Sequence, residues 1–312
     1  MGVLLSVIDQ NLLIPKVTWT TSDLPDLTSR VMIVTGGNSG LGRETAKILL
    51  LHNAKMYLAC RSRVKGEAAI TALEAETGKH AILLPLDLAS LDSIKAAAAE
   101  FQRQESFLHV LFNNAGVMAT PVTELTHEGY DLQFGVNTLG HFYLTKLLFP
   151  CLKAAAKKSS DHVARIIKTS SQMHILGSIH FEALTDTAVR SKMSPDALYA
   201  QSKFGNIVFS SECATRYGSD GIISIALHPG MLTTDIGRHF HPLKRWLIHA
   251  LCYPPSQGAL TQLWAGTSPE GASMNGKYLI PWARIGRPHL ETLNRETGAQ
   301  LWQWLEDQVR DR

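Results

Sequence analysis

One stretch near the start of the chain restricts the fold more than any other. The apolar run Val31–Val34 leads into a turn with glycines at 36, 40 and 42, and a helical pattern follows at once. Gly36 allows a sharp turn, Gly40 lets the backbone approach a bound group, and Gly42 lets the helix pack close to the sheet. The free N–H groups of the first helical turn suit an anion such as pyrophosphate. The stretch therefore predicts a strand, a phosphate loop and a helix, with a plain glycine turn as the alternative.

Strand and helix patterns alternate along the chain after this turn, with short connections. The expected strands are Val31–Thr35, Lys55–Cys60, Ala81–Leu86, Leu108–Phe112, Val163–Thr169 and Ile222–Ala226. The expected helices are Leu41–His52, Val64–Thr77, Leu91–Arg103, Tyr130–Ala156 and Ala197–Tyr217. Such alternation predicts an α/β fold, a doubly wound Rossmann-type parallel sheet with helices on both faces and ligands at the carboxyl ends of the strands. No composition break divides residues 1–312, so we expect one domain with a lead-in over residues 1–30 and a small C-terminal elaboration.

Composition excludes several classes of protein. Of the 312 residues, 45% are hydrophobic and 18% charged, which is ordinary for a soluble globular chain. The net charge of +3 is spread without basic blocks, so no nucleic-acid partner is expected. The four cysteines are far apart and the histidines form no ligand motif, which argues against a disulfide framework and a metal site. With no apolar run of about 18 residues and no signal peptide, we expect a cytoplasmic protein.

The end of the second expected strand bears on the choice of cofactor. In NAD-binding sheets a carboxylate at this point accepts a hydrogen bond from the ribose 2′-hydroxyl. Here the strand ends in Cys60-Arg61-Ser62, and a guanidinium suits a 2′-phosphate instead. We therefore expect NADP, with Arg43 as the next candidate reader if Arg61 is an ordinary surface residue. Asp87, after the third strand, is placed either to meet an adenine edge or to cap the next helix.

A tyrosine and a lysine four residues apart suggest the chemistry. Tyr199 and Lys203 would lie on one face of a helix, after a strand whose end carries Ser170 and Ser171. At ~4 Å and an effective dielectric of ~20, the ammonium would favour the phenolate by about 4 kcal/mol, roughly three pK units. We therefore expect a phenol that exchanges protons near neutral pH. The spacing alone is a weak signal, and its position in the alternating pattern strengthens it.

Taken in order, several motifs resemble the short-chain dehydrogenase/reductase family. They are Gly36-x-x-x-Gly40-x-Gly42, Asn113-Asn-Ala-Gly116, Asn137, Ser171, Tyr199-x-x-x-Lys203 and His228-Pro-Gly230, and they cover roughly Val31 to Thr234. Within the family, Ala59-Cys-Arg61 and a long interval between Ser171 and Tyr199 resemble the retinol-dehydrogenase-like and WW-domain-oxidoreductase-like branch. The family's usual interval is shorter, and the extra residues 172–198 are expected to form a loop at the rim of the active site.

The resemblance implies a role for each residue of the site. Tyr199 would donate or take the proton at a carbonyl oxygen, Ser171 rather than Ser170 would hydrogen-bond that oxygen, and Lys203 would bind the nicotinamide ribose. Asn137 would position a water that connects Lys203 to solvent. The implied cofactor-binding residues are Gly36, Asn38, Ser39, Gly40, Leu41, Gly42, Arg61, Asp87, Leu88, Asn114, Ala115, Gly116, Tyr199, Lys203, Pro229, Gly230, Leu232 and Thr234.

The expected activity is NADPH-dependent interconversion of a carbonyl and an alcohol on a largely apolar small molecule. Reduction of a C=C bond with the same tyrosine and lysine is one alternative. A catalytically silent NADP-binding interaction protein is another, although the intact Ser171, Tyr199 and Lys203 argue against it. The oligomeric state, including a homodimer, is left open.

Residues 231–255 are expected to form a substrate lid. Leu243, Trp246, Leu247, Ala250 and Leu251 recur at helical spacing, so one face of a short helix would be apolar. We expect this face to cover the open end of the sheet, with Trp246 or Leu247 touching the substrate. Simple core packing and a helix on a membrane surface, beside Lys244 and Arg245, are the alternatives.

Overall fold

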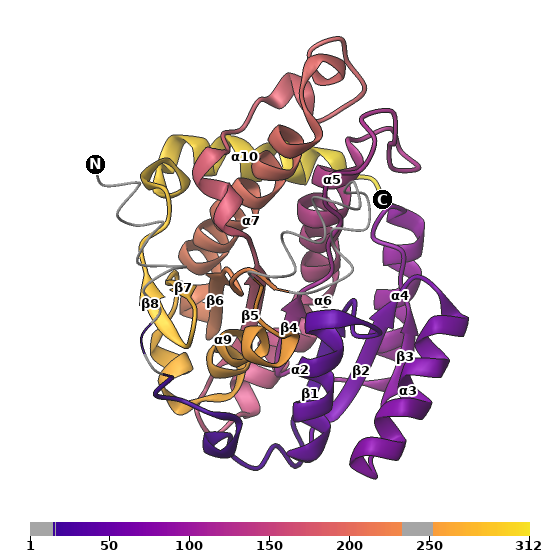
Figure 1. Cartoon of the computed structure of the whole chain (residues 1–312), viewed down its shortest axis with the longest axis vertical. Coiled ribbons are helices and arrows are strands. Elements are labelled where there is room, and N and C mark those ends of the chain that lie inside the picture. Colours follow the sequence, from indigo (N-terminus) through magenta and orange to yellow (C-terminus); the bar gives the residue numbers. More distant parts are fainter. Residues whose placement is uncertain (1–14, 16, 233–251) are drawn as a thin grey trace.

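An eight-stranded sheet forms the centre of the protein (Figure 1). The computed structural model describes residues 15, 17–232 and 252–312. Within them the strand order is β3-β2-β1-β4-β5-β6-β7-β8, parallel from β3 to β7 and antiparallel between β7 and β8. The strands are β1 Val31–Thr35, β2 Lys55–Cys60, β3 Ile82–Pro85, β4 Val110–Asn113, β5 Ala164–Thr169, β6 Ile222–Leu227, β7 Tyr278–Ile280 and β8 Arg284–Gly286. The expected Rossmann-type fold is confirmed.

Helices cover both faces of the sheet, because alternate strand residues point to opposite sides. On β1, Ile33 packs with residues of α4 Leu91–Gln104 and α6 Gly140–Lys158, whereas Val34 packs with those of α2 Gly40–Leu51 and α3 Arg63–Thr77. The first face is completed by α7 Pro195–Tyr217 and the second by α9 Pro255–Thr267. Two hydrophobic cores result, one on each side of the sheet.

The chain reverses its direction of travel across the sheet between β1 and β4. It runs outward from β1 through β2 to β3 and then returns to the other side of β1, where Ile33 pairs with Leu111 of β4. At such a switch point the connections leaving neighbouring strands diverge, which opens a crevice at their carboxyl ends. The fold therefore places a binding site beside the glycine turn.

The long helix expected over Tyr130–Ala156 is interrupted. The structure has a short α5 Leu132–Phe134, a π-helical turn Gly135–Leu139 and then α6. Glycines begin and follow this turn: a Cβ on Gly135 would collide with the Thr126 side chain, and one on Gly140 with the carbonyl oxygen of Leu88. The close packing requires glycine at both positions, and the turn between them carries Asn137. Helical periodicity gave no sign of this change in winding.

The C-terminal elaboration is larger than expected. It adds α9, β7, β8 and α10 Arg295–Gln308, which packs against α7 at one end of the molecule (Figure 1). Trp302 of α10 meets the rings of Phe142 and Phe209 at centroid distances of 5.1 and 6.1 Å. The expected lid falls mostly on residues 233–251, which lie outside the described residues.

The long interval between Ser171 and Tyr199 has defined structure. It holds three short 3₁₀ helices, Gln172–Leu176, Phe181–Ala183 and Arg190–Lys192. Arg190 is only 2% exposed, bonds Asp131 at 3.1 Å and donates to the backbone carbonyls of Val122 and Glu124. This network attaches the interval to the segment before α5, so the rim of the crevice is held in place.

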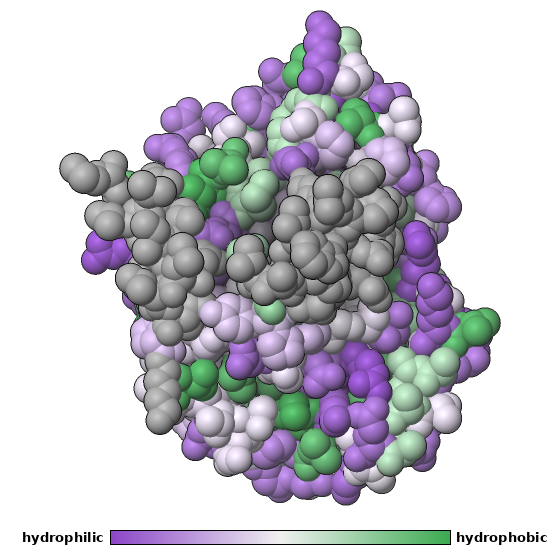
Figure 2. Space-filling model, viewed as in Figure 1, coloured by the Kyte–Doolittle hydropathy of each residue, from purple (hydrophilic) through white to green (hydrophobic). Residues whose placement is uncertain are grey.

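The surface mixes residue types. On the face shown in Figure 2, hydrophobic residues lie in small groups among hydrophilic ones. Among the described residues, no helix has the length and apolar character needed to cross a membrane.

Candidate active site

A cavity of about 840 Å³ lies at the carboxyl ends of the parallel strands. Most of the predicted site residues line it: Gly36, Asn38, Ser39, Gly40, Leu41, Gly42, Arg61, Asp87, Leu88, Asn114, Ala115, Gly116, Ser171, Tyr199, Lys203, Pro229, Gly230 and Leu232. Two do not belong to this lining. Asn137 lies behind the wall, and Thr234 lies outside the described residues.

The glycine turn has the shape of a cradle for a phosphate group. Gly36 and Gly40 have left-handed backbone angles, φ +67° and +50°, which glycine adopts without strain. A Cβ on Gly42 would collide with the carbonyl oxygen of Gly36. Ser39 precedes α2 without a side-chain hydrogen bond to the helix, so the first N–H groups of α2 are left for a ligand.

The end of β2 supplies two cations to the cavity. Arg61 and Lys65 both line it, and Ser62 between them caps α3 by accepting from the Lys65 N–H. Arg43 does not line the cavity, because it is ion-paired with Glu44 and Glu76. Arg43 is thus a poor second reader of a 2′-phosphate, and Lys65 is the residue that sequence reasoning missed. Its position one helical turn after Arg61 was the available signal.

Asp87 lies in the cavity wall and does not cap the next helix. Its carboxylate accepts from the Ala89 N–H at 2.9 Å, while Ser90 caps α4 by accepting from Ser93. Asp87 is thus not the N-cap itself, although its N–H donates to the Ser93 hydroxyl in the first turn of α4. The adenine contact stays a prediction.

The segment after β4 is fixed from behind by Thr35, the last residue of β1. The Thr35 hydroxyl oxygen accepts from the backbone N–H groups of Asn114 and Ala115, both at 2.9 Å. The Asn114 amide also donates to the Thr35 carbonyl at 2.8 Å. These bonds hold residues 114–116 against the glycine turn, where the Cα of Ala115 would lie 3.1 Å from a Cβ on Gly36.

Ser171, Tyr199 and Lys203 meet in the lining of the cavity. Ser194 caps α7 and Pro195 begins it, so Tyr199 and Lys203 fall on one face one turn apart. The Lys203 amine donates to the Thr169 carbonyl at 3.0 Å. Ser170 points away, because its hydroxyl donates to the Lys203 carbonyl at 2.7 Å. The geometry favours Ser171 over Ser170 as the serine beside the phenol.

The sequence predicts that Lys203 lowers the pKa of the Tyr199 phenol, and this prediction is wrong for the protein without ligand. Burial raises the pKa of Tyr199 to about 12, and the hydrogen bond from Ser171 offsets only part of this. Burial lowers the pKa of Lys203 to about 7. Loss of water disfavours both charged forms and outweighs the attraction between them that was expected from spacing alone. Tyr199 is thus a protonated acid at neutral pH.

Asn137 is engaged by protein atoms. Its amide donates to the Val117 carbonyl at 3.0 Å and the Ser202 hydroxyl at 2.9 Å, and its side-chain oxygen accepts from the Val117 N–H at 2.9 Å. A Cβ on Gly116 would lie 3.1 Å from that oxygen and 3.4 Å from the Lys203 amine. Asn137 and Lys203 therefore flank Gly116 together. The water-positioning role stays a prediction.

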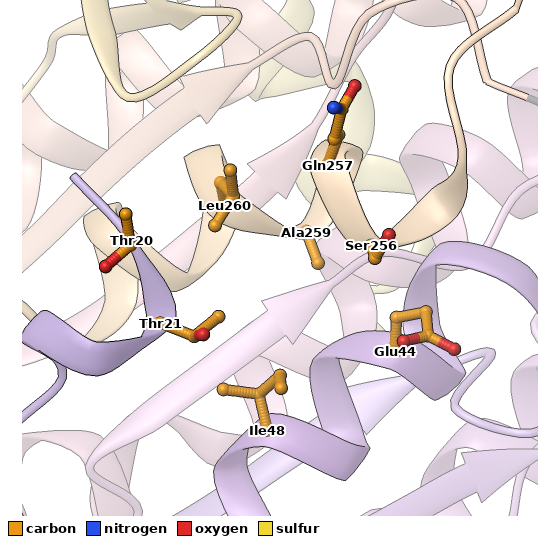
Figure 3. A pocket seen from close by; sticks show the side chains of 8 residues that line it. All are labelled: Thr20, Thr21, Glu44, Ile48, Ser256, Gln257, Ala259 and Leu260. Carbon is orange, nitrogen blue, oxygen red and sulfur yellow. The ribbon is translucent and has the colours of Figure 1, made fainter. Parts of the chain in front are cut away.

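Part of the cavity lining is an apolar wall. Sequence reasoning did not name its residues, which are Val117, Met118, Met173, Ile175, Leu176 and Met231. They come from the segment after β4, the 3₁₀ helix after Ser171 and the turn after β6. A smaller pocket of about 240 Å³ lies elsewhere, between α2, α9 and Thr20–Thr21 (Figure 3). None of the predicted site residues line it.

The residues present fit a dinucleotide. A ligand in this cavity would meet three polar features: the phosphate cradle, the cations Arg61 and Lys65, and the side-chain oxygen of Asn114. That oxygen is buried and has no hydrogen-bond partner among the described residues.

Comparison with known proteins identifies the family. The family model described as short chain dehydrogenase matches residues 30–243. The chain belongs to the short-chain dehydrogenase family. Two short-chain dehydrogenase/reductases of Armillaria gallica are 52% identical, over 95% of this chain and 96% of the other, and 50% identical over the full length of both.

Further relatives refine the position of the chain within the family. Human retinol dehydrogenase 11 is 39% identical over 88% of this chain and 84% of its own. The expected retinol-dehydrogenase-like branch is confirmed. A solved structure of an uncharacterised protein from Mycobacterium paratuberculosis covers 93% of this chain and 96% of its own, with TM-score 0.73 and 31% identity. Family membership assigns this chain oxidoreductase chemistry.

Proposed function

We propose that the protein is an NADPH-dependent reductase that converts a carbonyl group on a largely apolar substrate to an alcohol, with Tyr199 as the proton donor. The observation that carries the proposal is the meeting of Ser171, Tyr199 and Lys203 in a cavity that is lined by both the glycine turn and apolar side chains. A reduced nicotinamide bound there supplies a hydride. The protein must then supply a proton to the oxygen and hold the developing charge.

The protein's own groups suit that task. The Tyr199 hydroxyl stays protonated at neutral pH, since burial raises its pKa to about 12, so it is a donor rather than a base. Ser171 shares a hydrogen bond with the phenol and is placed to orient the same substrate oxygen. Lys203, held by the Thr169 carbonyl, lies beside the phenol and can take part in restoring its proton. The free protein thus holds the protonated acid that a reduction requires.

The preference for NADPH rests on the charges at the end of β2. Arg61 and Lys65 lie in this part of the cavity, and the carboxylates in the described lining, Asp87 and Asp196, come from other elements. A 2′-phosphate would meet two cations there, whereas a 2′-hydroxyl would meet no carboxylate from β2.

The substrate is proposed to be apolar because of the apolar wall of the cavity. Methionine and aliphatic side chains at 117, 118, 173, 175, 176 and 231 form it, and pockets for apolar ligands are lined in this way. The relatives named retinol dehydrogenases are named for an apolar alcohol.

The lid over residues 231–255 belongs to the same proposal. Loss of an apolar contact with the substrate costs ~1–3 kcal/mol. Trp246→Ala or Leu247→Ala should therefore raise KM for bulky apolar carbonyls by the corresponding factor and leave KM for small aldehydes unchanged.

NADPH consumption against a panel of carbonyls and enones tests the function. We expect turnover with apolar ketones or aldehydes and an alcohol as the product. Saturation of the C=C bond of an enone with its carbonyl intact would favour a double-bond reductase. Tight NADPH binding without turnover of any compound would favour a silent interaction protein.

A further inference from the structure

A lysine outside the predicted site lies wholly inside the protein. Lys168 is in the fifth position of β5, near the middle of the sheet (Figure 1), and its side chain is 0% exposed. The amine lies 5.0 Å from the centre of the Phe209 ring and donates to the Asn137 carbonyl at 3.1 Å. Among the described residues no carboxylate forms an ion pair with it. Burial, and repulsion from Lys203, hold its pKa well below the usual value.

Burying such a group without a counter-ion is costly. Lysine is almost never fully buried unless it is paired, and a methionine of similar length would fill the space without desolvating an amine. Packing therefore does not explain the choice of lysine. Compared with a methionine, the lysine nitrogen adds the hydrogen bond to the Asn137 carbonyl.

The Asn137 carbonyl connects this amine to the cofactor cavity. It also lies 3.1 Å from His141 Nδ1, and because a carbonyl only accepts, Nδ1 must carry the hydrogen. Burial keeps the ring uncharged by lowering its pKa, so Nε2 is an acceptor and takes the Thr35 hydroxyl hydrogen at 2.9 Å. Thr35 in turn accepts from the N–H groups of Asn114 and Ala115. A continuous chain of hydrogen bonds thus runs from Lys168 to the cavity wall.

We propose that Lys168 is a positioning residue of the active site, whose buried amine holds the Asn137 carbonyl and thereby the π-helical turn behind Lys203. The same turn aims the Asn137 amide at the Val117 carbonyl and the Ser202 hydroxyl. Without the amine, the carbonyl loses one of its donors, and the turn gains freedom next to the reacting groups. For its kinetic readout this inference rests on the proposed carbonyl reductase.

Lys168→Met tests the inference, with Phe209→Leu as the matched control. The first variant removes the donor and keeps the length of the side chain. The second disturbs the packing around the amine and leaves its hydrogen bond. For Lys168→Met we expect kcat about 5–10-fold lower, as for loss of one orienting hydrogen bond, with the melting temperature unchanged or higher because a buried amine is gone. Phe209→Leu should lower the melting temperature and keep kcat within twofold.

Hydrogen exchange gives a readout that does not depend on activity. Backbone amides of residues 135–142 should exchange faster in Lys168→Met than in the wild type, and no faster in Phe209→Leu. A kcat within twofold of wild type for Lys168→Met, unchanged exchange, or an equal loss of kcat in Phe209→Leu would overturn the inference. If the wild type reduces no carbonyl, the proposed function fails, and the exchange comparison still decides the role of Lys168.

Discussion

The amine of Lys203 lies 5.6 Å from the centre of the Tyr199 ring, one turn further along α7. The two side chains are 2% and 4% exposed, so neither group is well solvated. Burial lowers the pKa of the lysine to about 7 and raises that of the tyrosine to about 12. In the protein without ligand the pair is therefore a protonated phenol beside an amine that titrates near neutral pH. In such a pair, the Tyr199 phenol can act as the proton donor that a carbonyl reduction needs.

Tyr199→Phe should abolish carbonyl reduction and leave the Kd for NADPH within about twofold, because the hydroxyl serves proton transfer more than cofactor binding. Tyr143→Phe is the matched control, since the Tyr143 hydroxyl is buried in α6 and has no partner among the described residues. It should keep full activity. Retention of more than a few per cent of kcat in Tyr199→Phe would show that another group donates the proton.

Lys203→Met should change the way stability depends on pH. The folded protein releases the Lys203 proton near pH 7, whereas an unfolded lysine holds it to its usual value of 10.5. Between these values the unfolded chain binds the extra proton, so stability rises with pH, by up to about 1.4 kcal/mol per unit. The variant lacks this contribution and should show a flatter rise.

Urea midpoints at pH 7, 8 and 9, without cofactor, measure that difference. The range stops below pH 10 because an unfolded tyrosine releases its proton near that pH, whereas burial raises the pKa of Tyr199 in the folded protein to about 12. Above pH 10 this difference lowers the free energy of unfolding as the pH rises. Parallel pH dependence of the wild type and Lys203→Met would mean that the amine is not desolvated as the structure indicates.

Arg61→Asp should move the cofactor preference from NADPH toward NADH. The new carboxylate would repel a 2′-phosphate and accept from a 2′-hydroxyl. Arg63→Asp makes the same change of charge two residues later, at a side chain that pairs with Glu67 and does not line the cavity. The ratio of kcat/KM values for the two cofactors should shift for Arg61→Asp and stay constant for Arg63→Asp. Equal shifts would indicate a general field effect.

Arg190→Met should destabilise the protein by about 3–5 kcal/mol, because Asp131 would be left buried without its cation. Arg190 and Asp131 are each 2% exposed in their side chains, and their nitrogen and oxygen atoms are 3.1 Å apart. Adding Asp131→Asn, which can still accept from the Phe134 N–H, should recover part of the loss. Urea unfolding of both variants gives the two values. A loss under about 1 kcal/mol would mean that water replaces the guanidinium at this site.

The sequence predicted the sheet through β6, because each of these strands is an apolar run between helical patterns. It did not predict β7 and β8, whose three residues each are too short to show a period. The π-helical turn at Asn137 was missed for another reason. Gly135 and Gly140 are required by contacts with Thr126 and Leu88, which come from other parts of the chain.

The same limit applies to the site. Ordered motifs predicted half of the residues that line the cavity, since their spacing is local. The direction of the Tyr199 pKa depends on burial by the whole fold, and spacing to Lys203 could not supply it. Likewise, Arg43 is held by Glu76 of α3, a contact that only the packed helices produce. Lys65 and Lys168 are visible in the sequence, but their surroundings are not.

Transfer of deuterium from NADPH labelled at C4 of the nicotinamide is the most direct test of the proposed reaction. The wild type should convert an apolar ketone from the active panel to an alcohol that carries one deuterium on the former carbonyl carbon. Tyr199→Phe should yield no labelled product. Deuterium on a carbon of a former C=C bond, or NADPH that binds and transfers no deuterium to any compound, would contradict carbonyl reduction by this site.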